Sequence, residues 1–266
     1  MQLLAVMQNV PLWLAAVCIM AIAEIYSVGL MLWARNTYGV NRLSLNNEVA
    51  GFKFAVVGVF YAVFLAFVVI AVWEDYSDTE AAVRNEAKAA VDLYQVTFAL
   101  PVEAAGKIRG ALNTYMEGVQ KDEWPAMGRG ESSPAVATDL EKLSAEVFAV
   151  KPQDQRELVL YQHALALLTV MTDNRNERLD SANGSMTGIL WFVLIVGGLI
   201  TLGYPAFFAS SNRIAQVLMT AALAALVAMS LLLSLAFDFP FTGNPHISDR
   251  PFQDAQAQMQ PNWPPP

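Results

Sequence analysis

Residues 46–74 read NNEVAGFKFAVVGVFYAVFLAFVVIAVWE, and this stretch decides the fold of the chain. Between Lys53 and Glu74 no residue carries a charge. A helix of about 20 residues rises about 30 Å, which matches the hydrocarbon core of one bilayer. The stretch therefore predicts a transmembrane helix that is bounded by polar residues at both ends.

Small residues recur within this helix at spacings of three and four, which places them on one face: Gly51, Ala55, Gly58, Ala62 and Ala66. The other faces carry bulky residues, among them Phe60, Phe64, Phe67 and Ile70. A membrane helix with one small face either packs closely against another helix or turns that face to a narrow pore. We predict that this face lines a pore, and close packing is the alternative.

The composition is that of a membrane protein. The chain of 266 residues is 55% hydrophobic and 15% charged, whereas soluble domains are about 25% charged. Four runs with almost no charge are long enough to span a bilayer: 11–33, 54–73, 186–209 and 214–237. We predict an all-α polytopic membrane protein with four transmembrane helices and a helical extramembrane domain between the second and third.

The predicted organisation has four parts. Transmembrane helices 1 and 2 occupy 1–73, the helical domain 74–185, transmembrane helices 3 and 4 occupy 186–238, and an extended Pro- and Gln-rich tail occupies 239–266. Ala21-Ile22-Ala23 resembles a signal-peptidase site, but residues 1–10 contain no Lys or Arg and the apolar run continues past it. We therefore expect an uncleaved first span.

Glu24 lies near the middle of the first span. A carboxylate at that depth costs several kcal/mol unless it is protonated, paired or hydrated. Two interpretations are open. Glu24 is either a protonated or hydrogen-bonded residue against a neighbouring helix, or a pore, proton or cation site.

The insert between spans 2 and 3 is predicted to be helical. Ser77-Asp78-Thr79-Glu80 fits a capping box and predicts that a helix restarts there, and the alternative is one unbroken helix from 46 to about 98. Prolines and a Gly-Ser-Pro loop delimit the further predicted helices, which cover 101–125, 134–150 and 152–180. The tail after Asp238 shows no packing period and is predicted to be extended.

Basic residues indicate the membrane orientation. The short loops carry Arg35, Arg42 and Arg213, with Lys53 at the edge of the first loop. Short loops rich in Lys and Arg lie in the cytoplasm. This count favours an inner-membrane protein whose two termini and 74–185 domain lie together on the extracytoplasmic side.

Acidic residues lie at the ends of the second span. Glu74, Asp75, Asp78 and Glu80 follow it, and Glu48 precedes it. In a symmetric oligomer such carboxylates form rings that attract cations. Alternatively, they are only solvated acidic residues at the start of a helix, where the helix dipole favours negative charge. We predict that Glu48 guards one mouth of a pore, and Glu74 with Asp78 the other. The net charge of −8 argues against binding of nucleic acid.

No pattern for catalysis, cofactors or metals occurs in the chain. Sequence motifs of hydrolases, P-loops, dinucleotide-binding folds and zinc proteases are absent. His163 and His246 are far apart, and we expect His163 to be structural or solvated. The single cysteine, Cys18, lies in the first apolar run, so a disulfide within the chain is impossible. We expect no enzyme, no cofactor and no metal site.

The segment 46–74 resembles a bestrophin-like family of bacterial membrane proteins. The resemblance extends through EAKAAVDLY at 86–94, EWPAM at 123–127, DFPFTG at 238–243, and Ile247 and Phe252. It implies a homo-oligomeric ring of about five subunits around a pore that the second helix lines. It also implies chloride conduction and a cytoplasmic helical domain, whereas the charges here favour cations and the loop count favours the other side.

These observations lead to one functional hypothesis with two alternatives. The first is an oligomeric ion channel in the lipid bilayer, cation-favouring by charge, with chloride implied by resemblance. A non-conducting scaffold or sensor is favoured if the small face packs against Gly197 and Gly198 of the third span. An ion-coupled transporter would use Glu24 and would be expected to contain internal repeats, which the sequence does not show.

Overall fold

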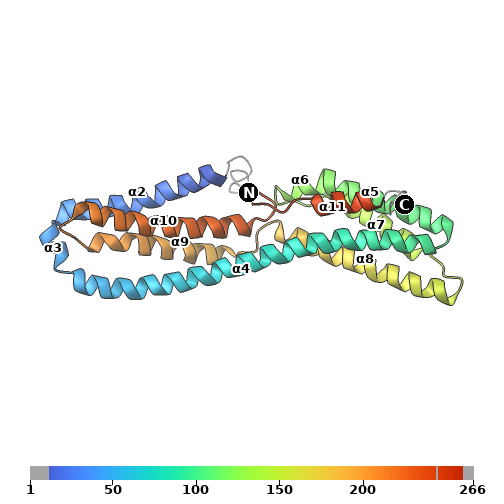
Figure 1. Cartoon of the computed structure of the whole chain (residues 1–266), viewed down its shortest axis with the longest axis horizontal. Coiled ribbons are helices and arrows are strands. Elements are labelled where there is room, and N and C mark those ends of the chain that lie inside the picture. The colour runs from blue at the N-terminus through green and yellow to red at the C-terminus, as the bar shows by residue number, and fades with distance from the viewer. Residues whose placement is uncertain (1–11, 244, 260–266) are drawn as a thin grey trace. The chain divides into compact units, whose positions relative to one another are not determined.

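A computed structural model describes residues 12–243 and 245–259 of the chain. Every regular element in these residues is helical (Figure 1). Four helices are long and apolar enough to cross a membrane: Trp13–Tyr38, Asn47–Ala99, Gly188–Phe207 and Arg213–Asp238. The prediction of an all-α protein with four spans is therefore confirmed.

The chain divides into two compact units. The membrane unit comprises Asn9–Glu74 and Ser185–Asp238. Its helices are α2 (Leu12–Tyr38), α3 (Val40–Ser44), the first half of α4 (Asn47–Val96), α9 (Gly188–Gly203), the short 3-10 helix η3 (Tyr204–Phe207) and α10 (Arg213–Asp238).

The second unit, which we call the helical unit, comprises Asp75–Gly184 and the segment that follows Asp238. Besides the second half of α4, it contains η1 (Thr97–Ala99), α5 (Val102–Gly118), η2 (Val119–Glu123), α6 (Trp124–Met127), α7 (Pro134–Phe148), α8 (Gln155–Ser181) and α11 (Arg250–Gln258).

Helix α4 runs without a break from Asn47 to Val96. No glycine or proline occurs between Gly58 and Pro101 to interrupt it. The hydroxyl of Thr79 donates a hydrogen bond back to the carbonyl of Asp75 at 2.8 Å, as in a helix interior. The predicted restart at Ser77 is therefore wrong, and the alternative of one unbroken helix is confirmed.

The membrane unit is held by close helix packing and by hydroxyl groups. In α2, Ser27, Met31 and Ala34 form one buried stripe, and the Ser27 hydroxyl donates to the carbonyl of Leu202 at 2.6 Å. The Tyr61 hydroxyl of α4 donates to the carbonyl of Leu194 in α9 at 3.2 Å. A methyl group at Gly197 would come within 2.8 Å of the Tyr61 ring, so only glycine permits this approach.

Polar side chains fix the connection between α9 and α10. The side-chain amide of Asn47 donates to the carbonyl of Ala209 at 2.8 Å and accepts from its amide at 3.1 Å. The Arg35 guanidinium donates to the carbonyl of Ser210 at 2.6 Å and to the side chain of Gln216 at 2.7 Å. The end of α2 and the beginnings of α4 and α10 therefore meet at one end of the membrane unit.

The helical unit contains one large apolar core, to which α4, α5, α7, α8 and α11 contribute. The helix predicted to end at Trp124-Pro125 differs in the structure. Helix α5 ends at Gly118, a π-helical turn follows over Val119–Glu123, and α6 continues through Pro125. Pro125 is tolerated because it lies in the first turn of α6.

The prediction of an extended tail is wrong for residues 250–258, which form α11. Phe252 in α11 is fully buried, and Phe241 is largely buried. Both rings pack against the indole of Trp124 with centroids 5.6 Å away. The hydrophobic positions of the tail are too few for a sequence period, but this packing is sufficient to order the segment.

Candidate functional site

Helix α4 has one packed side in the membrane unit. Tyr61, Leu65 and Val68 are buried in a cluster with Leu194 and Leu202 of α9 and with Ala224 and Val227 of α10. These α4 residues recur at spacings of three and four, so they form one stripe. Near the start of α4, Phe54 also packs against the rings of Tyr204 and Phe208, with centroids 5.4 and 5.7 Å away.

The predicted pore-lining residues lie beside this packed stripe. Ala55, Ala62 and Ala66 are exposed, whereas Gly51 and Gly58 are half-buried. Four of the five line a groove of about 660 Å³ between α4 and α10; Gly51 does not. The residue that packs on Gly197 and Gly198 is Tyr61. The small face is therefore not closed by the third span, which was the condition that would favour a scaffold.

The side of α4 that faces away from the packed stripe carries bulky residues. Val59, Val63 and Phe67 are 64%, 51% and 69% exposed. They follow one another at intervals of four residues, so they line one ridge next to the small-residue face. An exposed apolar ridge of this length is expected to meet lipid, another subunit or a dewetted pore.

The predicted mouth residues lie at the two ends of this part of α4. Glu48 is in the first turn, and Glu74 lies 26 residues further along the same helix, about 39 Å away. Asp78 follows Glu74 by one turn. All three side chains are exposed, and among the described residues none of them forms an ion pair.

Glu24 is half-buried in α2, one turn before the buried Ser27. Within residues 12–243 and 245–259 its carboxylate makes neither a hydrogen bond nor an ion pair. The hydrogen-bond partner of the first interpretation is thus not found in the described part of the chain.

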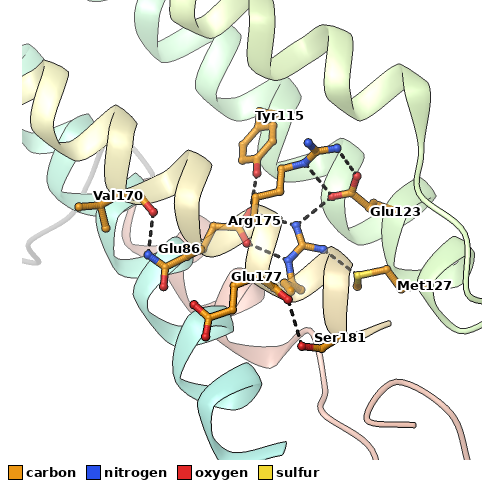
Figure 2. A network of polar contacts seen from close by, with 10 residues as sticks. Glu86, Tyr115, Glu123, Met127, Val170, Arg175, Glu177 and Ser181 are labelled. Carbon is orange, nitrogen blue, oxygen red and sulfur yellow. Dashed lines mark hydrogen bonds and ion pairs between the residues drawn. The ribbon is translucent and has the colours of Figure 1, made fainter. Parts of the chain in front are cut away.

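The sequence did not point to the most extensive polar cluster, which lies in the helical unit (Figure 2). Arg178 in α8 donates to both oxygens of Glu86 at 2.8 and 3.0 Å, and to Glu123 at 2.9 Å. Arg175 donates to the two oxygens of Glu123 at 3.2 and 2.5 Å. Tyr115 completes the cluster by donating to Glu86. These five residues form what we call the buried ionic cluster.

The buried ionic cluster is sealed from water. The side chains of Glu86, Glu123 and Arg178 are fully buried, and that of Arg175 is 8% exposed. The Arg178 guanidinium also lies 5.5 Å from the Trp124 ring centroid and 5.6 Å from that of Phe252. One side chain therefore ties α4, the π-helical turn, α6 and α11 to α8.

The electrostatics of the cluster favour the charged form of Arg178 and the neutral form of Tyr115. Burial alone would lower the pKa of Arg178, but the attraction of Glu86 and its hydrogen bonds outweigh burial and raise that pKa. Burial and the neighbouring Glu86 carboxylate raise the pKa of Tyr115 well above its usual value. Two carboxylates face two guanidinium groups, so the charges balance. We regard the cluster as a structural lock rather than a reactive site.

A second buried carboxylate ties the ends of two spans. Asp238, the last residue of α10, is 1% exposed. One of its oxygens accepts hydrogen bonds from the amides of Ser185 at 3.0 Å and Met186 at 2.8 Å, just before α9. The other accepts from the indole of Trp191 at 3.0 Å. The charge also lies near the N-terminus of α9, where the helix dipole favours it.

Comparisons with known proteins agree with this architecture. A family model for the Bestrophin-like domain matches residues 21–252. A crystal structure of a variant of a bacterial bestrophin homologue from Klebsiella pneumoniae superposes with a TM-score of 0.70 at 12% identity, covering 90% of this chain and 97% of that chain. Another structure of that homologue gives 0.68 at 13% identity, covering 90% and 96%. A comparison with curated proteins found no match.

Proposed function

Because the chain belongs to the Bestrophin-like family, we propose that it is one subunit of an oligomeric ion channel whose pore is lined by α4. Characterised members of the family are ion channels. The observation that carries the proposal is the open side of α4 in the membrane unit: Tyr61, Leu65 and Val68 are buried against α9 and α10, whereas Ala55, Ala62 and Ala66 on a neighbouring side are exposed. In a ring of subunits, the sides of α4 that are not packed within the subunit would face the central pore.

We assign the pore wall to the small-residue face: Gly51, Ala55, Gly58, Ala62 and Ala66. The exposure of the three alanines supports this assignment. So does the packing against Gly197 and Gly198 of α9, which is made by Tyr61 and not by the small-residue face. The ridge of Val59, Val63 and Phe67 is the second candidate, because it lies opposite the packed stripe. A bulky ridge would make an apolar constriction, whereas the small face would make a wider bore.

We assign the two mouths to Glu48 at one end, and to Glu74 with Asp78 at the other. Among the described residues no cation forms an ion pair with these exposed carboxylates, and in a ring the fields of the carboxylates would add. The charge of these three carboxylates favours cations. Glu24, which lacks a partner among the described residues, is assigned to ion binding or to support of the pore helix.

Ion flux through the purified protein in liposomes tests the proposal. Under a KCl gradient, a reversal potential near the potassium equilibrium value would support cation conduction, and one near the chloride value would support anion conduction. Glu74→Gln with Asp78→Asn should reduce cation preference. The matched control is Asp122→Asn with Glu141→Gln, which makes the same change of charge on exposed residues of the helical unit.

Cysteine substitution identifies the pore-facing side of α4. In a Cys18→Ala background, a water-soluble thiol reagent should block flux through Ala62→Cys if the small face lines the pore, and through Val63→Cys if the bulky ridge does. Leu65→Cys, on the packed stripe, is the control that should not react. Reaction at none of the three would contradict a pore along α4.

Two results would favour one of the alternative functions over an ion channel. Folded, oligomeric protein that carries no flux under any gradient would favour a scaffold or sensor. Saturable, proton-coupled flux that Glu24→Gln abolishes would favour a transporter, an outcome to which the unpartnered carboxylate of Glu24 gives a specific basis.

A further inference from the structure

One end of the membrane unit is rich in cations. We call residues 33–53 and 204–214 the basic end. They contain Arg35, Arg42, Lys53 and Arg213, but only one acidic residue, Glu48. The segments come together in space, because Ala34, Leu43, Ala206 and Ala209 share one buried cluster. The start of α4 joins them, because Asn47 is hydrogen-bonded to Ala209. The four cations therefore come from segments that meet at one end of the membrane unit, although these segments are separate in the sequence.

Three of these cations have no partner in the described structure. The Arg35 guanidinium is used internally, on Ser210 and Gln216. The side chains of Arg42, Lys53 and Arg213 are exposed, and within the described residues they form neither ion pairs nor hydrogen bonds. The basic end therefore presents positive charge that the protein itself does not neutralise.

Exposed aromatic and aliphatic side chains accompany the cations. Trp33 and Tyr38 are 56% and 51% exposed, and their rings meet edge to face at 6.0 Å. Phe52, next to Lys53, and Ile214, next to Arg213, are also largely exposed. Aromatic side chains of this kind gather at the headgroup level of a membrane. Trp33 and Tyr38 beside the cations are therefore typical of the level of a membrane at which lipid phosphates lie.

From this charge complementarity we propose that the basic end binds the headgroup of an anionic phospholipid. Arg42, Lys53 and Arg213 supply the positive charge, and Phe52 and Ile214 contact the adjoining glycerol and acyl region. A free phosphate ion would bind the cations but would make no contact with the apolar side chains. The ligand that fits both the cations and the apolar side chains is therefore a lipid. This binding does not depend on ion conduction.

The test compares lipid binding by the full chain in detergent. Retention of phosphatidylglycerol and of phosphatidylcholine is measured by native mass spectrometry, together with the thermal midpoint in each lipid. The test variant is Arg42→Gln/Lys53→Gln/Arg213→Gln. The control variant Lys88→Gln/Lys151→Gln/Arg156→Gln makes the same change of charge at exposed positions of the helical unit.

We expect wild type and control to retain phosphatidylglycerol and to be stabilised by it. Each cation near an anionic surface contributes about 1 kcal/mol, or about fivefold in binding, so the test variant should lose on the order of a hundredfold. High salt should weaken binding by the wild type. Equal retention by the test variant, equal response to phosphatidylcholine, or the same stabilisation by inorganic phosphate alone would overturn the proposal.

Discussion

Replacing Arg178 by methionine should destabilise the helical unit strongly. Methionine has a similar length and no charge, so the main change is the loss of the cation. Glu86 would lose both guanidinium hydrogen bonds, of 2.8 and 3.0 Å, and keep only Tyr115. Glu123 would keep Arg175. The substitution therefore leaves one fully buried carboxylate without a counter-charge.

The expected magnitude follows from this geometry. Removing one partner of a buried ion pair costs about 3–5 kcal/mol, because the remaining charge stays desolvated. At about 2–4 °C per kcal/mol for a domain of this size, the thermal midpoint should fall by roughly 6–20 °C. Arg156→Met, an exposed position at the start of α8, is the matched control and should change the midpoint little.

A double-mutant cycle makes the prediction sharp. In the wild-type background Glu86→Gln should lower the midpoint, because it leaves Arg178 with fewer acceptors. In the Arg178→Met background the same Glu86→Gln change should raise it, because it removes the uncompensated charge. Circular dichroism of the detergent-purified chain measures all four proteins. If Glu86→Gln has the same sign in both backgrounds, the reasoning about the buried ionic cluster is wrong.

Three further perturbations test other parts of the fold. Burial and the Glu86 carboxylate raise the pKa of Tyr115 in the folded protein, whereas an unfolded tyrosine has a pKa of about 10. The stability that the protonated Tyr115 hydroxyl contributes is therefore complete below about pH 10 and is lost as the pH rises further. Tyr115→Phe should make the thermal midpoint fall less steeply in alkali. Trp191→Phe removes one hydrogen bond to Asp238 and should lower the free energy of unfolding by about 1.5–3 kcal/mol, whereas Asp238→Asn should lower it more. Equal losses of thermal stability in the two variants would contradict the role of the Asp238 carboxylate in joining the ends of the two spans. Phe252→Ala should lower the free energy of unfolding by about 3–5 kcal/mol and should speed hydrogen exchange in α11. If the tail were not part of the core, the rate of exchange in α11 would stay unchanged.

The four spans could be predicted because membrane insertion is decided locally. About 20 consecutive apolar residues suffice, whatever the rest of the chain does. The same locality made the small-residue face of α4 visible, since a spacing of three and four fixes a helical side. What covers that side depends on α9 and α10, and their placement is not a property of the α4 sequence.

The errors in the sequence interpretation arise where contacts or geometry beyond a local sequence pattern decide the structure. The Ser77–Glu80 pattern favours a helix start, but an existing helix needs no new start when nothing breaks it. Trp124-Pro125 predicts a helix end, whereas in the structure a π-helical turn over Val119–Glu123 precedes α6, and Pro125 lies in the first turn of α6. The tail orders through Phe252 and Phe241, two contacts that no local period reveals.

The buried ionic cluster illustrates which part of a site a sequence can signal. Ala164, Leu168 and Met171 are buried at alternating spacings of four and three, and the same spacing continues to Arg175 and Arg178. Charged residues in the register of a buried stripe predict buried charges, which must find partners. The partners lie 52 to 92 residues away in the sequence, on α4 and the π-helical turn. The spacing of Arg175 and Arg178 is therefore a signal that α8 buries positive charge, but only the fold selects Glu86 and Glu123 as the partners.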